Sequence, residues 1–402
     1  VWANSKALEV AGIDRNTPDF VPGFAFYQRD ESGEPSGWVT ESAAFLFVNN
    51  FRSITAEDEE QFHGFLTYLR DMGVTTLLDA GNFGMDDETY AAMSRLDKAG
   101  RLPLRYHGTF TLSVPDDYDT AVEQVLELNR KYGSDRLRID TLKIFHDGVI
   151  ETRTADMFDD YLDTPGNSGA SLFSEQQLHD LIIELSNEGI NLHMHSVGDQ
   201  STNKLLNAVE QVHETLDGPP PIRIAICHLE LVLDTDFYRF KDLGVIASFT
   251  PAWHGGVGDH NVRAAVGDKA GWQMRAQPMI ADDAVVTFSS DITTASGWWS
   301  EAANPYWGMQ IGHNRQVIEG GPDAPYALPR SERIRLDTLV EGYTINGAYQ
   351  LGRSDELGSI EVGKQADLVI LNQNLFDVNR YDVHKTKPVA VIMDGELVHG
   401  EL

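Results

Sequence analysis

Apolar residues follow two periodicities along most of this chain, one typical of helices and one typical of buried strands. Helical spacing predicts helices over residues 5–10, 56–72, 87–99, 117–132, 175–188, 200–215, 234–243, 270–283 and 333–351. Thr55 can cap one of them, and Ser174 with Gln177 forms a capping box for another, which Gly189 ends. Short apolar runs between the helices predict strands at 74–81, 104–112, 137–148, 190–196, 222–230, 245–251 and 284–291.

The predicted strands are apolar on both faces, as in a parallel sheet that helices cover. Seven of them lie between Val74 and Asp291, whereas a closed barrel of alternating strands and helices needs eight. We therefore predict an α/β fold, a TIM-like (β/α)8 barrel that lacks its first strand, over residues 1–352. Its opening segment, residues 1–50, is irregular and contains one predicted hairpin. Residues 353–402 hold short strands and turn residues, which predict a small C-terminal antiparallel β domain.

The composition narrows the class of protein. With 402 residues, of which 42% are hydrophobic, the chain can bury a large core. The single cysteine, Cys227, excludes a disulfide framework and a metal site made only of cysteines. The net charge of −31 argues against nucleic acid as a partner, because phosphate binding needs a basic surface. No apolar run reaches the roughly 18 residues of a membrane span, so we expect no membrane partner and a cytoplasmic location.

Polar residues with ligand chemistry gather at the carboxyl ends of the predicted strands. His193 and His195 are two positions apart in one strand, so both imidazoles point to the same side. The other strand ends carry Lys143, Asp147, His228 and Asp291. In parallel α/β proteins that end of the sheet binds ligands and metals. Because zinc prefers imidazole nitrogen and carboxylate oxygen, the joint placement predicts a metal-dependent active site.

Each of these residues also has an ordinary structural interpretation. The histidine pair could be hydrogen-bonded core residues. Lys143 could lie in a seam between helix and sheet, and Asp291 could cap the next segment. Only the shared position at one end of consecutive strands favours a site.

Many segments, taken together, resemble the amidohydrolase superfamily, and within it the branch that includes N-substituted formamide deformylases. In chain order they are VWANSKALEVAGI, GEPSGWVTESA, GVTTLLDAG, LKIFHDGVIETRTA, LHMHSVGDQSTNKLLNAVE, CHLELV, GVIASFTPAWH, FSSD, LVEGYTINGAYQLG and LGSIEVGKQADLVILN. The resemblance implies a distorted (β/α)8 barrel with a flanking β-sandwich built from both termini, and one or two zinc ions.

The resemblance also implies roles for single residues. The implied metal ligands are Lys143 in carboxylated form, His195, His228 and Asp291. Asp291 would also act as general base, and His228 would help to polarise the carbonyl oxygen. His193 and Asp147 would line the substrate pocket.

One part of the family's pattern is not found in this chain. The first barrel strand of the family ends in His-x-His, and the only such pair here, His193 and His195, belongs to the fifth strand. We therefore expect this chain to be a fragment whose upstream part would carry that motif. An open barrel exposes sheet edges, which proteins avoid, so we expect a homodimer, strand exchange or aggregation.

Residues in the loops after the strands suggest how a small-molecule substrate would be held. Trp253, Trp298 and Trp299 could form an apolar wall, although ordinary packing explains such residues slightly better. His254 is a candidate for a polar contact. Arg153 could meet an anionic group, but it could equally pair with one of the many acids.

Three hypotheses remain open. The first is a zinc-dependent hydrolase of the C–N bond in an amide, N-acyl or N-formyl small molecule, with a metal-activated water as nucleophile. The second is a metal-free or inactive relative that only binds small molecules or a partner. The third is a deaminase of cyclic amidines, which would use the same ligands.

Overall fold

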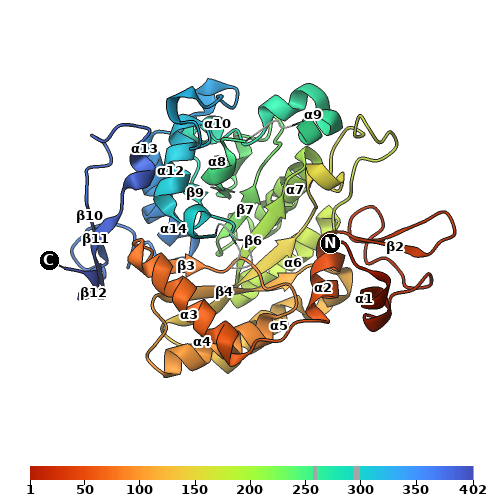
Figure 1. Ribbon diagram of the computed structural model, residues 1–402, viewed down its shortest axis with the longest axis horizontal. Coiled ribbons are helices and arrows are strands. Elements are labelled where there is room, and N and C mark those ends of the chain that lie inside the picture. Colours follow the sequence, from red (N-terminus) through yellow and green to blue (C-terminus); the bar gives the residue numbers. More distant parts are fainter. Residues whose placement is uncertain (257–259, 293–298, 402) are drawn as a thin grey trace.

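The centre of the molecule is a parallel β-sheet whose strands follow one another in sequence order (Figure 1). The computed structural model describes residues 1–256, 260–292 and 299–401. Within these residues the sheet has seven strands: β3 (Thr76–Leu78), β4 (Arg105–Leu112), β5 (Leu137–Phe145), β6 (Asn191–Ser196), β7 (Ile224–His228), β8 (Ile246–Phe249) and β9 (Val286–Phe288). The predicted fold class is confirmed, because these seven strands curl into part of a TIM-like barrel.

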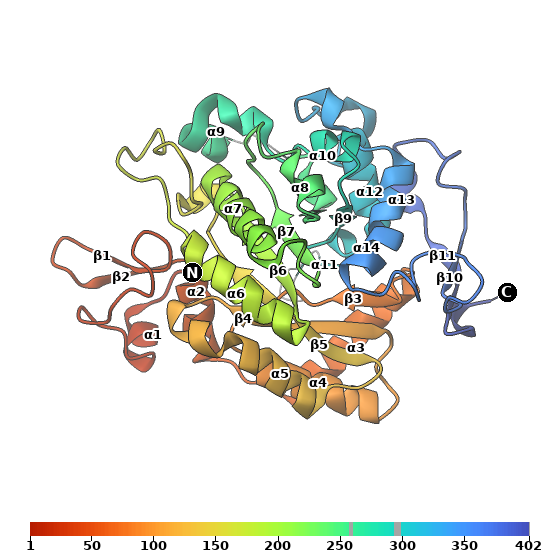
Figure 2. The same cartoon turned by 180° about the vertical axis from the view of Figure 1, so that it is seen from behind.

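Helices alternate with the strands and surround the sheet. Those before β7 are α1 (Ser5–Val10), α2 (Glu41–Asn49), α3 (Ala56–Asp71), α4 (Asp86–Lys98), α5 (Ala121–Tyr132), α6 (Glu175–Glu188) and α7 (Asp199–Leu216). Those after β7 are α8 (Arg239–Asp242), α9 (His260–Val266), α10 (Gln277–Ala281), α11 (Trp299–Ala302), α12 (Pro305–Asn314), α13 (Leu336–Tyr343) and α14 (Ile345–Gln350). Figure 2 shows α4 to α7 along one side of the sheet. Among the described residues no helix combines the length and apolarity that a bilayer crossing needs.

Two helix starts that the sequence predicts from side-chain capping are confirmed. The Thr55 hydroxyl accepts a hydrogen bond from the backbone N–H of Asp58, whose carboxylate accepts one from the backbone N–H of Thr55. Ser174 and Gln177 form the same reciprocal pair at the start of α6, and Gly189 follows its last residue. Each pair satisfies N–H groups that have no partner within the helix.

Four predicted helices differ from the structure. The helix predicted at 117–132 is a 3-10 helix over Pro115–Thr120 followed by α5. The helix predicted at 234–243 is reduced to α8, and the one at 270–283 is reduced to α10, where Pro278 is tolerated only in the first turn. The helix predicted at 333–351 is divided at Thr344, which has φ −123° and ψ −94°. The Thr344 hydroxyl donates to the carbonyl oxygen of Val340 at 2.6 Å. Such side-chain bonds compete with helical hydrogen bonding.

The two ends of the chain form small antiparallel sheets at opposite ends of the molecule (Figures 1 and 2). Near the N-terminus β1 (Tyr27–Arg29) pairs with β2 (Pro35–Val39), as the predicted hairpin. The C-terminal sheet contains β10 (Leu368–Leu371), β11 (Pro388–Met393) and β12 (Glu396–Gly400). A sandwich built from both termini would require the N-terminal strands to join the C-terminal sheet. Here β1 and β2 form a separate sheet. The domain boundary at residue 352 stays a prediction.

The register of the central sheet decides which side chains are neighbours inside it. Lys143 of β5 pairs with His193 of β6, Phe145 pairs with His195, and His195 pairs with Cys227 of β7. Paired residues on neighbouring strands point to the same face of a sheet. All five side chains are buried. The strand order alone thus brings three predicted site residues together.

The central sheet does not close on itself within the described residues. There β3 and β9 each have a neighbouring strand on one side only. This agrees with the open barrel that the strand count predicts.

We expect Gly108→Ala to destabilise the protein by about 2 kcal/mol, because a Cβ in β4 would overpack a fixed ring. That Cβ would lie 2.5 Å from the ring of Tyr90, which is fully buried. The Tyr90 hydroxyl donates to the carbonyl oxygen of Thr109 at 2.6 Å and accepts from its N–H at 2.7 Å, so the ring cannot easily move. Urea denaturation measures the change in the free energy of unfolding.

Gly64→Ala is the matched control, because no atom lies within 4 Å of the Cβ position at Gly64 in α3. Alanine should there raise the free energy of unfolding by roughly 0.5–1 kcal/mol. Equal stabilities for the two variants would contradict the predicted overpacking.

Candidate functional site

A cavity of about 1270 Å³ lies inside the curled sheet and is lined by side chains from every strand between β3 and β9. Six of the residues predicted for the site line this cavity: Lys143, His193, His195, His228, Trp253 and Asp291. Three further predicted residues whose side chains the structure describes, Asp147, Arg153 and His254, do not form part of its wall. The structure therefore gathers all four candidate metal ligands around one cavity.

His195 and His228 are adjacent, with their ring centres 4.5 Å apart. His228 directly follows Cys227, and in a regular strand their side chains would point to opposite faces. The φ of +74° at His228 breaks this alternation, so both residues line the cavity. Burial lowers the pKa of His228 to about 3, so its imidazole is neutral at neutral pH.

The His195 ring is oriented by the loop that follows β5. Its Nε2 lies 3.2 Å from the carbonyl oxygen of Gly148. A carbonyl oxygen only accepts hydrogen bonds, so Nε2 carries the hydrogen and donates it. Burial lowers the pKa of His195 well below its usual value, which leaves the ring neutral and a lone pair on Nδ1. Histidines that bind metals are usually oriented by such a bond from the other nitrogen.

Asp147 lies behind His195 and supports the same loop. Its Oδ1 is 3.6 Å from Nε2 of His195. Its carboxylate accepts backbone N–H groups of Val197 at 3.1 Å, Gly198 at 2.8 Å and Asp156 at 3.1 Å. Complete burial raises the pKa of Asp147, and these three donors oppose that rise. This placement suits a residue that orients His195.

His193 is held from the opposite side of the barrel. Nε2 of Gln350, in α14, donates to Nδ1 of His193 at 3.2 Å. Oε1 of Gln350 accepts from the Thr287 hydroxyl of β9 at 2.7 Å, which fixes the orientation of the amide. Burial lowers the pKa of His193 well below its usual value. The neutral ring therefore carries its hydrogen on Nε2, where it can be donated to a substrate oxygen.

Lys143 lies in the cavity wall and not in a seam between helix and sheet. Its Nζ donates to Sγ of Cys227 at 3.1 Å. Burial raises the pKa of the Cys227 thiol, and the Lys143 charge opposes that rise. The Lys143 charge also helps to lower the pKa values of His193, His195 and His228. The amine therefore lies among these three histidines and Cys227.

Asp291 follows β9 with its side chain open to the cavity and a φ of +45°. Withdrawal from bulk water raises the pKa of Asp291, and the Lys143 charge opposes that rise. A carboxyl group whose pKa is raised can accept and release a proton closer to neutral pH than an exposed one.

The atom types available in the cavity are those that bind zinc. His228 Nδ1 is buried and has no hydrogen-bond partner among the described residues, and Nδ1 of His195 keeps its lone pair. Imidazole nitrogen with carboxylate oxygen is a common zinc ligand set. No three His, Cys, Asp or Glu side chains in the described part of the chain are close enough to enclose an ion. The candidate metal-binding residues therefore line one cavity but do not surround a common point at ligand distance.

Trp253 and its neighbour His254 differ in position. The Trp253 ring stacks on His228 at 5.3 Å, with 9° between the ring planes. His254 is fully buried, lies edge-on to Phe249 at 5.7 Å, and has no hydrogen-bond partner for either ring nitrogen among the described residues. The predicted apolar wall thus includes Trp253, whereas Trp298 and the side chain of Trp299 lie outside the described residues.

Arg153 is not brought to the cavity, because acids and carbonyl groups nearby hold its guanidinium. It forms an ion pair with Asp163 and donates to the Asn261 side chain at 2.6 Å and to the Glu151 carbonyl oxygen at 2.6 Å. From the sequence, Arg153 could pair with an acidic residue of the protein and not with a substrate, and the structure shows such a pair.

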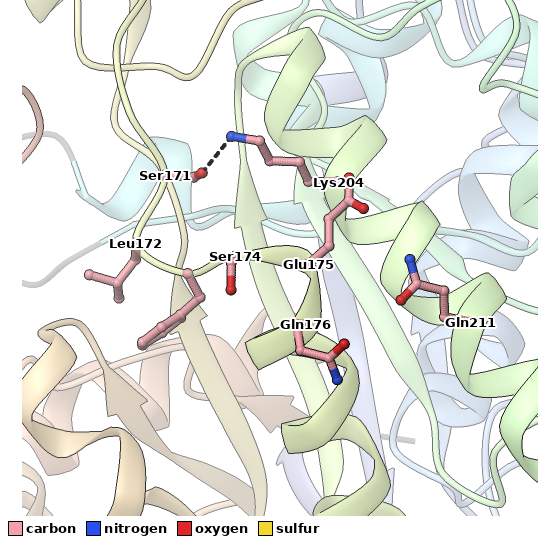
Figure 3. A pocket seen from close by; sticks show the side chains of 8 residues that line it. Ser171, Leu172, Ser174, Glu175, Gln176, Lys204 and Gln211 are labelled. Atoms are coloured by element: carbon pink, nitrogen blue, oxygen red, sulfur yellow. Dashed lines mark hydrogen bonds between the residues drawn. The ribbon is translucent and has the colours of Figure 1, made fainter.

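A second, more open hollow of about 640 Å³ lies between the start of α6 and α7 (Figure 3). Lys204 reaches into it, but its amine already donates to Asp156 at 2.6 Å and to Ser171 at 3.0 Å. None of the described residues that line this hollow belongs to the predicted site. The inner cavity is therefore the candidate active site.

Three cavity residues, Glu41, Cys227 and Gln350, are not indicated by the sequence patterns as site residues. Cys227 directly precedes His228 in a strand, and this adjacency is the one signal available for it. Gln350 is 157 positions from His193, and no local pattern connects the two. Glu41 lies in the irregular opening segment, where no periodicity indicates which side chains point inward.

Comparison with known proteins identifies relatives of this chain. A sequence profile of the amidohydrolase family matches residues 1–399. N-substituted formamide deformylase from Arthrobacter pascens is 28% identical over 408 residues, which cover 98% of this chain and 71% of that protein. The exoenzymes regulatory protein AepA from Pectobacterium carotovorum subsp. carotovorum is 31% identical over 208 residues, which cover 52% of this chain but only 44% of that protein.

A solved structure has the same fold. An uncharacterized metal-dependent hydrolase from Pyrococcus horikoshii OT3 is similar with a TM-score of 0.68 at 24% identity. The match covers 94% of this chain and 70% of that one.

We expect His254→Leu to make the protein less sensitive to acid. Burial lowers the pKa of His254 to about 3 in the folded state, against about 6.5 in an unfolded chain. Between these values the unfolded chain binds a proton that the folded protein does not, so stability falls as pH falls. Without this group, the stability lost between pH 7 and pH 5 should be smaller by about 2 kcal/mol.

Urea denaturation at both pH values measures this difference. His260→Leu, at an exposed histidine of α9, is the control and should lose as much stability on acidification as the parent protein. An unchanged acid loss in His254→Leu would show that His254 is not buried in its neutral form.

Proposed function

The chain belongs to the amidohydrolase family, and from that premise we propose that it is a zinc-dependent hydrolase of C–N bonds in small amides. The bond cleaved is that of an N-acyl or N-formyl amine, by analogy with the N-substituted formamide deformylase that the chain resembles.

One juxtaposition supports this function above all others. Two neutral imidazoles, His195 and His228, are adjacent in a cavity that also contains Lys143 and Asp291. The four side chains come from different strands or strand ends of one sheet, as a catalytic metal site at such a sheet requires.

The ion would be held by His195 through Nδ1, by His228 and by Asp291, with Lys143 contributing if it is carboxylated. When bound, such an ion lowers the pKa of a water and polarises the substrate carbonyl. Carboxylation converts the Lys143 cation into an anion, which suits a site that must balance one or two divalent cations.

The protein's own groups move the protons. Asp291 accepts a proton from the attacking water and delivers it to the amide nitrogen, so that the C–N bond breaks and an amine leaves. The remaining product is the carboxylic acid. His193 donates its Nε2 hydrogen to the carbonyl oxygen, where negative charge develops during the attack. Gln350 keeps His193 in the tautomer that this role needs.

A second candidate function is binding without catalysis. It is favoured by the lack of three closely gathered His, Cys, Asp or Glu side chains in the described part of the chain. The two candidates differ in whether the protein takes up a metal.

Several expectations from the sequence belong to the proposal as well. These are a small-molecule substrate, a cytoplasmic location and a homodimer, with no nucleic acid or membrane as partner. The net charge of −31 supports the absence of a nucleic-acid partner, since phosphate binding needs a basic surface.

Elemental analysis of the purified protein should find one or two zinc ions per chain, and dialysis against a chelator should abolish amide hydrolysis. Zinc added back should restore activity, because the ligand set needs the ion to activate water. A panel of N-formyl amines, N-acetyl amines and cyclic amidines identifies the bond that is cleaved. A protein that neither contains nor takes up zinc would support the binding function instead.

We expect Asp291→Asn to lower kcat by roughly 10²- to 10⁴-fold, because asparagine cannot accept the proton. KM should change little, since the amide has nearly the shape of the carboxylate. Asparagine also tolerates a positive φ, so the backbone at this position should be kept. Steady-state kinetics with the best amide of the panel provide the measurement.

Asp283→Asn is the matched control, because Asp283 also has a positive φ, +61°, but its side chain does not line the cavity. Its kcat should equal that of the parent protein. An Asp291→Asn enzyme with full activity would remove Asp291 from the proposed mechanism.

A further inference from the structure

Glu41 is a cavity residue with a strained backbone. It is the first residue of α2 and has a φ of +48°, a left-handed conformation that non-glycine residues rarely adopt. Such strain persists only where surrounding contacts impose it, and it is often found where a side chain must be aimed. The Glu41 side chain lines the same cavity as the candidate metal ligands.

The hydrogen bonds to Glu41 hold one oxygen of its carboxylate, Oε1. The hydroxyls of Thr154 and Thr152 donate to Oε1 at 2.6 Å and 2.8 Å. Within the described residues, the hydrogen bonds to this carboxylate reach only Oε1. The side chain is therefore locked in orientation, with Oε2 available to a ligand.

Glu41 lies close to the proposed catalytic centre. Its Cδ is 3.0 Å from the position that a Cβ would take on Gly148, and the Thr154 hydroxyl oxygen is nearer still at 2.1 Å, so glycine is required mainly by Thr154 and Glu41 packs beside it. The carbonyl oxygen of Gly148 is the group that accepts the hydrogen bond from His195. A ligand at Glu41 would thus lie next to Gly148, the residue to which His195 is hydrogen-bonded.

Aromatic rings surround this part of the cavity. Phe45 lies one helical turn after Glu41, on the same face of α2. Its ring stacks on Phe83 with 4.0 Å between centres and meets Phe145 edge-on at 6.1 Å. Aromatic faces attract cations, and more strongly where water is excluded.

The charges of the cavity also favour a cationic ligand. Six carboxyl side chains line it within the described residues: Glu41, Asp79, Glu151, Glu230, Asp291 and Asp367. The one cationic side chain among its described lining residues is Lys143. Burial raises the pKa of Glu41, the nearby acid Glu151 raises it further, and the positive charge of the Val1 ammonium opposes both, so Glu41 already responds to a cation.

We propose that Glu41 binds an alkylammonium group of the ligand through Oε2, with Phe45, Phe83 and Phe145 packed against the carbon atoms next to it. This inference rests on the proposed amide hydrolysis only for the substrate class that it names: N-acyl amines that carry a second, protonated amine. Glu41 is then the residue that determines specificity for that amine.

The first test measures binding alone, by titration calorimetry on the protein as purified. The probes are 4-methylbenzylamine, which is protonated at pH 7, and 4-methylbenzyl alcohol, which has nearly the same shape without the charge. The amine should bind at least ten-fold more tightly than the alcohol, as expected for a charge-assisted hydrogen bond in a partly desolvated site. Glu41→Gln should remove this difference.

Glutamine keeps an oxygen that can accept from Thr152 and Thr154, so Glu41→Gln should fold normally and lose only the charge. Glu31→Gln makes the same change in the exposed turn between β1 and β2 and should keep the preference for the amine. Equal affinities for amine and alcohol in the parent protein, or an unchanged preference in Glu41→Gln, would overturn the proposal.

The second test uses hydrolysis of N-formyl-4-(aminomethyl)benzylamine and N-formyl-4-methylbenzylamine. The parent protein should prefer the amine-bearing amide by at least ten-fold in kcat/KM. Glu41→Gln should lower kcat/KM for that amide alone, whereas an equal loss for both amides would indicate a purely structural role. If neither amide is hydrolysed while the amine still binds through Glu41, the proposed hydrolysis fails and the binding site stands.

Discussion

The burial of uncharged imidazoles between parallel strands is the constraint on which the rest of the site depends. A protonated imidazole inside the sheet would lose its hydration, and this desolvation is the main cause that lowers the pKa values of His193, His195 and His228. At neutral pH these rings keep lone pairs, which is the state that binds metals. The hydrogen bonds from Gln350 to His193 and from His195 to Gly148 then decide which nitrogen of each ring keeps its lone pair.

Lys143 is the residue that this arrangement satisfies least. Its amine is buried, and the hydrogen bond it makes is to the thiol of Cys227, a weak acceptor. A buried ammonium without a close carboxylate is costly. Carboxylation of Lys143 would remove that cost, because it replaces the cation by an anion that divalent ions can balance. Carboxylation and metal binding would therefore stabilise each other.

The sequence predicts those features of the fold that depend on local periodicity. The seven strands, the capped starts of α3 and α6 and the terminal hairpins all follow from the spacing of apolar and turn residues. The alternation within a strand also predicts that His193 and His195 share a face. The split at Thr344 is missed because no change in apolar spacing accompanies the non-helical backbone there, φ −123° and ψ −94°.

The candidate site is predicted less completely, because several of its contacts join distant parts of the chain. Gln350 reaches His193 only after the sheet has curled, and no local pattern encodes that contact. The inward turn of His228 depends on a φ of +74°, which the residue type does not indicate. Arg153 and His254 are placed away from the cavity by neighbours that loop sequences do not specify, Asp163 in one case and Phe249 in the other.

Left-handed backbone recurs around the cavity wall, at Glu41, Phe83, His228, Met274 and Asp291. Each such residue costs about 1 kcal/mol or more, so the surrounding structure must impose it. The parallel strands beneath are hydrogen-bonded to one another and supply that rigidity, while the strained residues lie in loops or at element ends, where alternation can be broken. Gly148 lies between two side chains of the cavity, since its carbonyl accepts from His195 and the position of a Cβ on it is 3.0 Å from Glu41 Cδ. A ligand drawn to Glu41 would therefore press on the residue that orients His195, and substrate recognition and ligand geometry at the histidine pair would be set by the same short loop.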